Sequence, residues 1–568
     1  MLPLSYQTHD LTLEPPGDTI SALPDGRSVD AIDALAWLLI SAILLMSVRV
    51  GRLSGDGLVQ THNYLTHTWH LNPNHLLYEP LGAAWLSSIR RLGLARPAVD
   101  QMLLLSVAAG SLTLAIFRRF VACHAATRTA ANAATAWVAF SAAFMGLWLS
   151  SEAQMVQMPW LVASYAAAVA YAARPTTTRA VITGLAIGAA TLFYISNGFI
   201  AVSIPVVLAV GARYAGLQYP TKQLAAILAV AILAAATGFI MAWLVTAAGT
   251  MSLVTWLTTY GGGHASSRIA ATYGIHGIAE LPTAVARAVY GTALGVVDVS
   301  GAVADMRTQG TITVMSLAAV VVCACVLALL GYSTMRTAAS RDRRRSMLLI
   351  ALAWLSAVFA FGVFWNNSDD QFYFQMSIAL GALVAASWTG RTRLTLALAT
   401  VALVAWNGVA AWRGLIAYPR DQYIAGLTAN VVGADLVIFP GSDEIMQLMY
   451  FVPTGNGEKR INLTSVAGNA PASVGLSTVV RDIDCALADE QRVVMLDVAV
   501  PGAGDSWRAL GLLGYPRDRV MATLDRYTFA DPHRVGPFVA RRLVPKQHNL
   551  RPACELAGPE NETQQPSH

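Results

Sequence analysis

The chain has 568 residues, of which 55% are hydrophobic and only 12% are charged, with a net charge of +5. A soluble globular protein carries roughly 25% charged residues, so a chain this poor in charge needs lipid to cover much of its surface. Its arginines are scattered between apolar runs, and no basic block indicates a nucleic acid as a partner. The composition therefore predicts an α-helical integral membrane bundle in contact with the lipid bilayer.

The N-terminal segment differs in composition from the rest of the chain. Residues 1–30 are polar and acidic, and they include Glu14, Asp18, Asp25 and Asp30. A cleavable signal peptide would begin with a basic stretch and an apolar core, so none is expected here. We predict that residues 1–30 form a disordered cytoplasmic tail.

Eleven apolar runs lie beyond this segment, and they predict about eleven transmembrane helices over residues 31–412. Their bounds are roughly 31–49, 98–117, 131–150, 156–173, 180–194, 196–212, 223–248, 311–332, 346–364, 372–388 and 394–412. Residues 180–212 could instead form one bent, broken pair around Asn197 and Gly198, because glycine interrupts helices.

Basic residues indicate the orientation of the bundle. They recur in alternate connections, while the short connections at 151–155, 195 and 365–371 carry neither Lys nor Arg. The positive-inside rule then places the N-terminus in the cytoplasm and the C-terminal domain outside a bacterial inner membrane. The first outer loop disagrees, because it contains Arg90 and Arg91 among other arginines. Anion binding in that loop would explain their presence.

Two predicted outer loops are long, residues 50–97 and 249–310. Within the first, residues 81–92 place their apolar side chains on one helical face and end in Arg90 and Arg91. This pattern is typical of an interfacial helix. The second loop contains Trp256 and Tyr260, and such aromatic residues suit the membrane surface.

The polar half of the first loop is the densest cluster of functional side chains in the sequence. Four of the eleven histidines fall within fourteen residues, followed by Tyr78 and Glu79; they are His62, His67, His70 and His75. A solvated loop, a metal site and a substrate site are all compatible with this cluster. The histidine spacings match no standard zinc motif, so a divalent metal remains a possibility without a defined ligand set.

Two further outer connections carry acids. Glu152 is the only acidic residue between positions 101 and 279, and it lies between the third and fourth predicted spans. It either caps a helix together with Ser151 or serves a site. Asp369 and Asp370 form a pair in another short connection, where they cap the next helix or bind a metal or a sugar hydroxyl.

Residues 413–568 are expected to form a small extracytoplasmic α/β domain. Residues 436–439 and 492–497 are typical of strands, and residues 443–451 and 480–490 are typical of helices. Cys485 and Cys554 are the only cysteines of this domain. In an oxidising compartment they are candidates for one disulfide, the alternative being two buried thiols.

The layout resembles the type C glycosyltransferase superfamily, polytopic enzymes that take sugars from polyprenyl-phosphate carriers, such as protein mannosyltransferases and lipid A aminoarabinose transferases. The shared features are an early acid in a long loop after the first span, an interfacial helix, an acid after the third span and an outer C-terminal domain. Here these are Asp56 within Gly55-Asp56-Gly57, residues 81–92, Glu152 and residues 413–568. The stretch from Asn74 to Gly82 also resembles an N-H-L-L-Y-x-P-L-G segment of bacterial members. One feature departs from the family, because Gly57 follows Asp56 where a paired Asp-Glu is usual.

The resemblance implies an inverting transfer of a sugar from a polyprenyl-phosphate donor to a glycan, lipid or protein acceptor at the outer membrane face. Asp56 is then the expected catalytic base, with Glu152 beside it in the same cavity. The histidines, Tyr78, Glu79, Arg90, Arg91, Asp369 and Asp370 are expected to bind substrate, the two arginines through the lipid phosphate. The alternatives are a transporter or flippase for a lipid-linked glycan, which needs polar groups through the bilayer, and a non-catalytic assembly or sensor protein.

Overall fold

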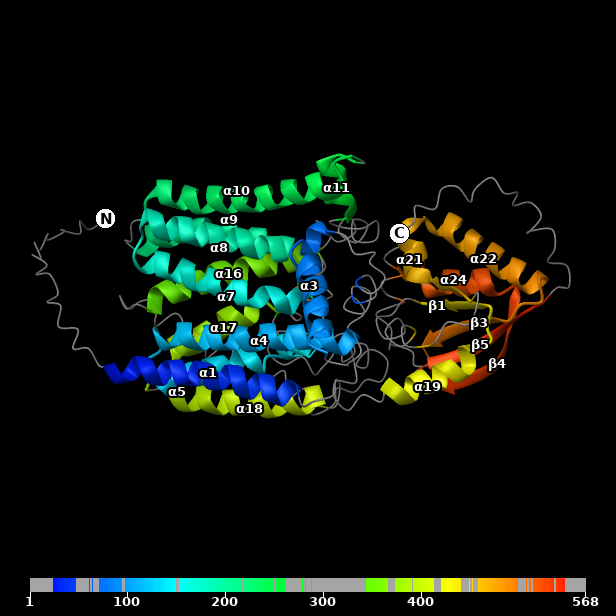
Figure 1. The fold of residues 1–568 in the computed structure, drawn as a ribbon, viewed down its shortest axis with the longest axis horizontal. Helices are drawn as coiled ribbons and strands as arrows, with labels where there is room; N and C mark the ends of the chain where they lie inside the picture. The colour runs from blue at the N-terminus through cyan, green and yellow to red at the C-terminus, as the bar shows by residue number, and fades with distance from the viewer. Residues whose placement is uncertain are drawn as a thin grey trace, which may run out of the picture.

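The computed structural model is a bundle of apolar helices followed by a smaller domain built on one sheet (Figure 1). It describes residues 24–46, 71–93, 98–149, 153–215, 219–249, 251–260, 344–365, 373–390, 392–412, 420–440, 458–498, 514–535 and 538–546, with a few isolated positions between them. The fold class predicted from composition is therefore correct in outline: a helical membrane bundle and a small α/β domain.

The bundle helices follow the predicted apolar runs. They are α1 (Pro24–Met46), α4 (Ala98–Ala122), α5 (Arg128–Ala139), α6 (Ala142–Trp148), α7 (Ala153–Ala173), α8 (Thr177–Phe193), α9 (Gly198–Ala215), α10 (Thr221–Thr246), α16 (Arg344–Trp365), α17 (Met376–Ser387) and α18 (Arg393–Ala411). Four helices are long and apolar enough to cross a membrane, and α5 and α6, bent by 64° at their junction, make a possible fifth. Four shorter apolar helices accompany them, so the predicted number of eleven spans is not established by the described residues.

Two boundaries differ from the sequence-based expectation. Helix α1 begins at Pro24, so residues 24–30 are helical where a disordered tail was expected. The predicted run at 180–212 is divided into α8 and α9 by the short 3-10 helix η2 (Ile195–Asn197), as the Asn197-Gly198 pair suggested. The predicted run at 311–332 lies outside the described residues.

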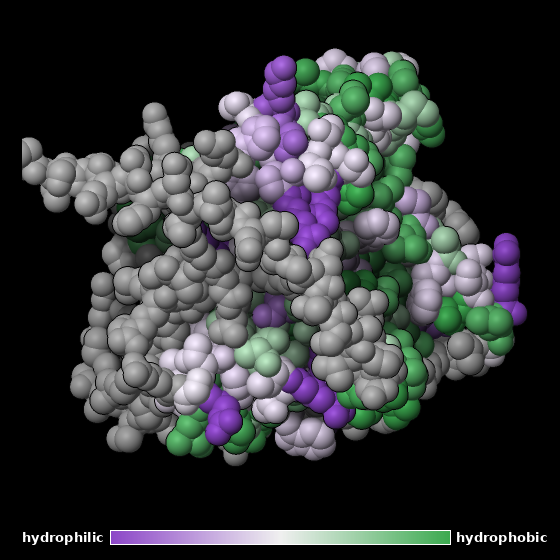
Figure 2. Space-filling view, turned by 90° about the vertical axis from the view of Figure 1, so that its left-hand side faces the viewer, coloured by the Kyte–Doolittle hydropathy of each residue, from purple (hydrophilic) through white to green (hydrophobic). Residues whose placement is uncertain are grey.

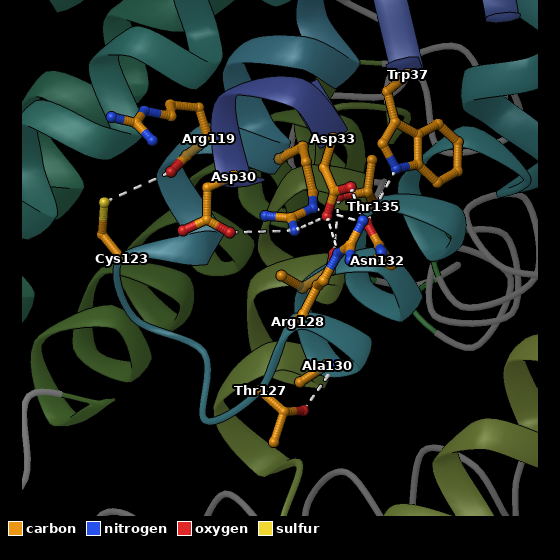
Figure 3. A network of polar contacts seen from close by, with 12 residues as sticks. Asp30, Asp33, Trp37, Arg119, Cys123, Thr127, Arg128, Ala130, Asn132 and Thr135 are labelled. Atoms are coloured by element: carbon orange, nitrogen blue, oxygen red, sulfur yellow. Dashed lines mark hydrogen bonds and ion pairs between the residues drawn. The ribbon is translucent and has the colours of Figure 1, made fainter. Parts of the chain in front are cut away.

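An ion-pair network joins the start of α1 to α4 and α5 (Figure 3). The carboxylate of Asp33 accepts hydrogen bonds from Arg118 Nη2 at 2.5 Å and from Arg128 Nε at 2.7 Å. Arg118 also donates from Nε to Asn132 Oδ1 at 2.7 Å, and its Nη2 lies 3.4 Å from Asp30. The Arg118 side chain is fully buried, whereas that of Arg128 is 60% exposed. This pairing places Asp30, the last acid of the N-terminal segment, and Asp33, in the first predicted span, against basic residues of the bundle.

Basic residues gather at this end of the bundle, which we call the basic end. Helices α4 and α7 finish there, and α5, α8, α10, α16 and α18 begin there (Figure 1). The terminal turns at this end contain Arg119, Arg128, Arg179, Lys222, Arg344, Arg345 and Arg393. Figure 2 views the protein from this end. Among the coloured residues, hydrophilic side chains lie on the end itself and hydrophobic side chains lie on the sides of the bundle.

The opposite end, which we call the α3 end, is crossed by α3 (Tyr78–Arg91). This helix lies roughly perpendicular to the bundle helices (Figure 1). The predicted helix at 81–92 is therefore present, with a start three residues earlier than expected, and its interfacial position stays a prediction. Its preceding turn is the 3-10 helix η1 (Pro73–His75), and α11 (Leu253–Tyr260) lies at the same end.

The C-terminal domain lies beyond the α3 end (Figure 1). Its elements are α19 (Arg420–Val431), β1 (Leu436–Phe439), β2 (Lys459–Asn462), α21 (Leu463–Asn469), α22 (Ala472–Ala488), β3 (Val493–Val498), α24 (Arg517–Leu524), β4 (Tyr527–Val535) and β5 (Phe538–Pro545). The strand order is β2-β1-β3-β5-β4; β1 is parallel to β2 and β3, and β5 is antiparallel to β3 and β4. Helices α22 and α24 cover one face of the sheet and α19 covers the other.

The two strands predicted from the sequence are correct within one residue. The predicted helix at 480–490 is the second half of α22, and that at 443–451 lies almost wholly outside the described residues.

Cys485 is disulfide-bonded. Cys554 lies outside the described residues, so its role as the partner stays a prediction.

Candidate functional site

The α3 end is held in place by backbone and side-chain hydrogen bonds to the bundle. Trp85 Nε1 donates to the Gln101 carbonyl at 2.7 Å, which attaches α3 to the first turn of α4. The Leu77 amide donates to the Leu192 carbonyl at 3.0 Å, which attaches the start of α3 to the end of α8. Leu76 packs in one apolar cluster with Phe239 and Trp256, so the first long loop contacts α10 and α11. Three distant segments therefore meet at this end.

Helix α3 is amphipathic, and its two faces have different surroundings. Tyr78, Glu79, Gly82, Leu86 and Ile89 are buried. Arg90 and Arg91, in its last turn, are exposed. The helix thus presents a buried carboxyl group in its first turn and two guanidinium groups in its last turn. Because an α-helix rises about 1.5 Å per residue, these groups lie well apart along its length.

Glu79 is a buried carboxyl group without a charged partner among the described residues. Its side chain belongs to a residue only 4% exposed, and Oε2 has no hydrogen-bond partner there. Burial raises the pKa of Glu79 to about 7, and the neighbouring Tyr64 hydroxyl opposes this only in part. The group therefore exchanges a proton near neutral pH, which is uncommon for a structural carboxylate.

Tyr64 reaches Glu79 because Gly82 leaves room for it. A Cβ at position 82 would lie 2.6 Å from the Tyr64 hydroxyl oxygen, closer than real contacts allow. Tyr64 is 4% exposed, and burial raises the pKa of its hydroxyl well above the usual range. The tyrosine stays protonated and presents a hydroxyl group toward the carboxyl.

His75 is the only predicted histidine of the cluster that the structure describes. Its ring packs against Tyr194 at a centroid distance of 4.9 Å. Burial lowers the pKa of His75 to about 4, so the ring is neutral at pH 7. Its Nδ1 has no hydrogen-bond partner among the described residues, and the ring is therefore able to accept or donate one bond to a bound molecule.

A network of three buried amides, which the sequence patterns did not predict, lies next to this cluster. Asn197 Nδ2 donates to Gln157 Oε1 at 2.6 Å and to the Ala190 carbonyl at 2.8 Å. Gln375 Nε2 donates to Asn197 Oδ1 at 2.9 Å. The Asn197 amide bonds to the Tyr194 carbonyl, and Tyr194 packs on His75, so the network continues to the first loop. It joins the starts of α7 and α17 to the break between α8 and α9.

An apolar groove of about 400 Å³ opens beside η2, between α9, α10 and α11. Ile195, Ala231, Phe239, Leu253 and Leu257 are among its lining residues. Ile195 directly precedes the amide network, so the groove begins at the α3 end. Such a surface holds hydrocarbon and offers nothing to a polar ligand.

Most residues predicted to carry the chemistry lie outside the described residues: Asp56, His62, His67, His70, Glu152, Asp369 and Asp370. The helices that flank two of these stretches are described. Helix α7 begins at Ala153 and α16 ends at Trp365, both at the α3 end (Figure 1).

In the described part of the chain, no three His, Cys, Asp or Glu residues lie close enough together to hold a metal ion. The expected divalent metal remains untested.

Comparisons with known proteins find similarity in structure but not in sequence. No family model matches the chain, and no curated protein matches it. Among solved structures, a crystal structure of ArnT from Cupriavidus metallidurans bound to undecaprenyl phosphate is similar over 92% of this chain and 98% of that chain. The TM-score is 0.48 and the sequence identity is 12%. A score below 0.5 at this identity carries no conclusion about activity, so the function is inferred from the residues of this chain.

Proposed function

We propose that this protein is a membrane glycosyltransferase that moves a sugar from a polyprenyl-phosphate donor to an envelope acceptor at the α3 end of the bundle. The observation that carries this proposal is the collection of polar groups at one end of an apolar bundle. Glu79, Tyr64, His75 and the amide network meet there, beside the apolar groove. A substrate with a polar head at the membrane surface and a hydrocarbon tail in the bilayer matches both features.

The distribution of charge supports a surface reaction over ion-coupled transport. In the described parts of the bundle helices, acidic and basic side chains occupy the turns near the helix ends, apart from Asp33 in α1, which pairs with Arg118 and Arg128 at the basic end. The polar residues deeper in the bundle near the α3 end are the neutral amides Gln157, Asn197 and Gln375. A transporter usually keeps ionisable groups near the bilayer midplane. A transferase that acts at the membrane surface needs none.

The same distribution supports an outward orientation of the site. Basic residues line the basic end, and by the positive-inside rule that end faces the cytoplasm. The α3 end and the C-terminal domain then face outward, where a lipid-phosphate sugar is used without a nucleotide. Arg90 and Arg91 are the basic residues of the α3 helix, and we assign them to the donor phosphate, which guanidinium groups bind well.

The proposed reaction is a single displacement at the anomeric carbon. Asp56 removes the proton from the acceptor hydroxyl as its oxygen bonds to the anomeric carbon. The bond from that carbon to the phosphate oxygen breaks, and polyprenyl phosphate leaves with the electron pair, stabilised by Arg90 and Arg91. The configuration is inverted. Glu152 is assigned to the same cavity, and Glu79 and His75 are assigned to hydrogen bonds with sugar hydroxyls.

The test is sugar transfer by the purified protein. Polyprenyl-phosphate sugars and cell-envelope acceptors are incubated with it, and glycosylated products are measured by mass spectrometry. Asp56→Asn and Glu152→Gln should each reduce transfer about a hundredfold or more, since general-base catalysis contributes about 10²–10⁴-fold. Asp100→Asn, which removes another acid at the start of α4, is the matched control and should retain activity. Normal transfer by a folded Asp56→Asn protein would refute the assigned base.

A further inference from the structure

The C-terminal domain contains a polar pocket of about 380 Å³ that the transfer reaction does not use. It is formed where the first residues of β3 meet the middle of β4 and the middle of β5, beside the last turn of α19. Its charged lining residues are Arg492, Arg541, Arg542, His533 and Asp531. Arg541 precedes Arg542 along β5, so its side chain lies on the opposite face of the sheet, over the Phe529 ring. The guanidinium groups of Arg492 and Arg542 against one carboxylate give this pocket an excess of positive charge.

Arg492 and Arg542 differ from other basic residues of the domain. Lys459, Arg517 and Arg526 each pair with an aspartate within 3.5 Å. Neither Arg492 nor Arg542 forms such an ion pair with the described residues. Arg492 donates to the carbonyls of Asn430 and Val432 at the end of α19, which fixes its guanidinium group beside the pocket. Within the described residues, no ion pair neutralises the charge of Arg492 or of Arg542.

The strand irregularity at this point places further polar groups at the pocket. The register of β4 against β5 shifts between Ala530 and His533, and Asp531 has a positive φ of 49°. A non-glycine residue in this region of φ is uncommon and costs conformational energy. The bulge brings Asp531 and His533 to the pocket rim, opposite Arg542, which pairs with Val494 on one side and Ala530 on the other.

We propose that this pocket binds an anionic sugar unit. The arginines supply donors for a carboxylate or phosphate, which guanidinium groups recognise with paired hydrogen bonds. Asp531 and Asn430 supply acceptors for hydroxyl groups, which a bare anion lacks. The pocket volume is sufficient for a single sugar ring with its anionic group.

The position of the pocket favours a water-side glycan over a lipid headgroup. The parallel strands point their carboxyl ends toward the bundle, where α21 follows β2 (Figure 1). Arg492 precedes β3, so the pocket lies at the amino ends of these strands, on the side of the domain away from the bundle. A glycan chain that extends from the membrane reaches it, whereas a headgroup in the bilayer plane does not.

Binding to the full-length protein in detergent tests this inference by titration calorimetry, independently of any transfer activity. The probes are glucuronate and glucose 6-phosphate, with glucose and inorganic phosphate as references. Arg542→Gln should weaken binding of at least one anionic sugar about tenfold or more, because a charge-assisted contact is lost. Arg519→Gln removes an exposed arginine of α24 outside the pocket and should leave binding unchanged.

Three results would overturn the inference. One is the absence of binding by both anionic sugars. Another is equal weakening by Arg542→Gln and Arg519→Gln, which would indicate non-specific attraction to basic surface. The third is binding of inorganic phosphate as tight as that of the sugar anions, which would remove the role of the sugar ring.

Discussion

Replacing Asp33 with asparagine tests the ion-pair network at the basic end. The substitution keeps the shape of the side chain and, among the described residues, removes the only charge that directly contacts both Arg118 and Arg128 (Figure 3). Arg118 is fully buried, and its second partner, Asp30, lies 3.4 Å away and is 29% exposed. Leaving a buried charge without its partner costs about 3–5 kcal/mol. We expect a loss near the lower end of that range, because Asn132 still accepts one hydrogen bond from Arg118.

The assay is reversible unfolding in mixed micelles, followed by tryptophan fluorescence. Asp30→Asn is the matched control, since its longer and partly exposed contact is expected to contribute about 1 kcal/mol or less. Equal and small losses for the two variants would refute the reasoning, because they would show that Arg118 is solvated or paired elsewhere.

Three further predictions concern α3. Glu79 has a folded-state pKa of about 7, above its ordinary value of 4.5, so its contribution to stability is complete below pH 4.5 and is lost as the pH rises toward 7. Relative to Glu79→Gln, the wild type should therefore lose up to about 3 kcal/mol of unfolding free energy between pH 4.5 and 7, and parallel pH profiles would contradict the assigned burial. Gly82→Ala should lower the free energy of unfolding by about 1–3 kcal/mol, because the added methyl group displaces Tyr64. The control is Gly146→Ala, whose methyl group meets no atom within 4 Å and should not destabilise the protein. Equal shifts of the melting temperature in the two variants would reject the close contact at Gly82. The double substitution of Arg90 and Arg91 by glutamine should raise the apparent KM for the lipid donor about tenfold, with little change in kcat. The control Lys222→Gln, at the basic end, should leave this KM unchanged. Unchanged donor kinetics in the double variant would mean that the two arginines only contact lipid headgroups.

Much of the bundle was predictable because its signal is local. Apolar runs of sufficient length form helices in lipid whatever their neighbours, so the described spans lie close to the predicted ones. Leu436–Phe439 was predictable for a similar reason: all four residues are buried, and a short apolar run bounded by Pro440 and Gly441 indicates a central strand. Strand β4 was missed because most of its side chains are exposed and polar and show no alternation.

The site was less predictable because its properties depend on contacts between distant segments. The sequence suggested Glu79 as a ligand, but its raised pKa results from burial beside Tyr64, which Gly82 permits. Asn197 was predictable as a helix break, whereas its bonds to Gln157 and Gln375 span 40 and 178 residues of chain. Hydrophobic periodicity describes only neighbouring residues, so it does not predict hydrogen bonds between segments this far apart in the sequence. Hydrophilic residues inside otherwise apolar runs, as at Gln157, were the available signal.

The most direct test of the central proposal follows a lipid-linked sugar in proteoliposomes that contain the protein. Donor and acceptor are supplied on the side that carries the C-terminal domain, and both lipid products are measured by mass spectrometry. A transferase should yield polyprenyl phosphate and glycosylated acceptor in equal amounts, with no movement of intact donor between leaflets. Intact donor that crosses the bilayer without release of polyprenyl phosphate would contradict the proposal and identify a flippase instead.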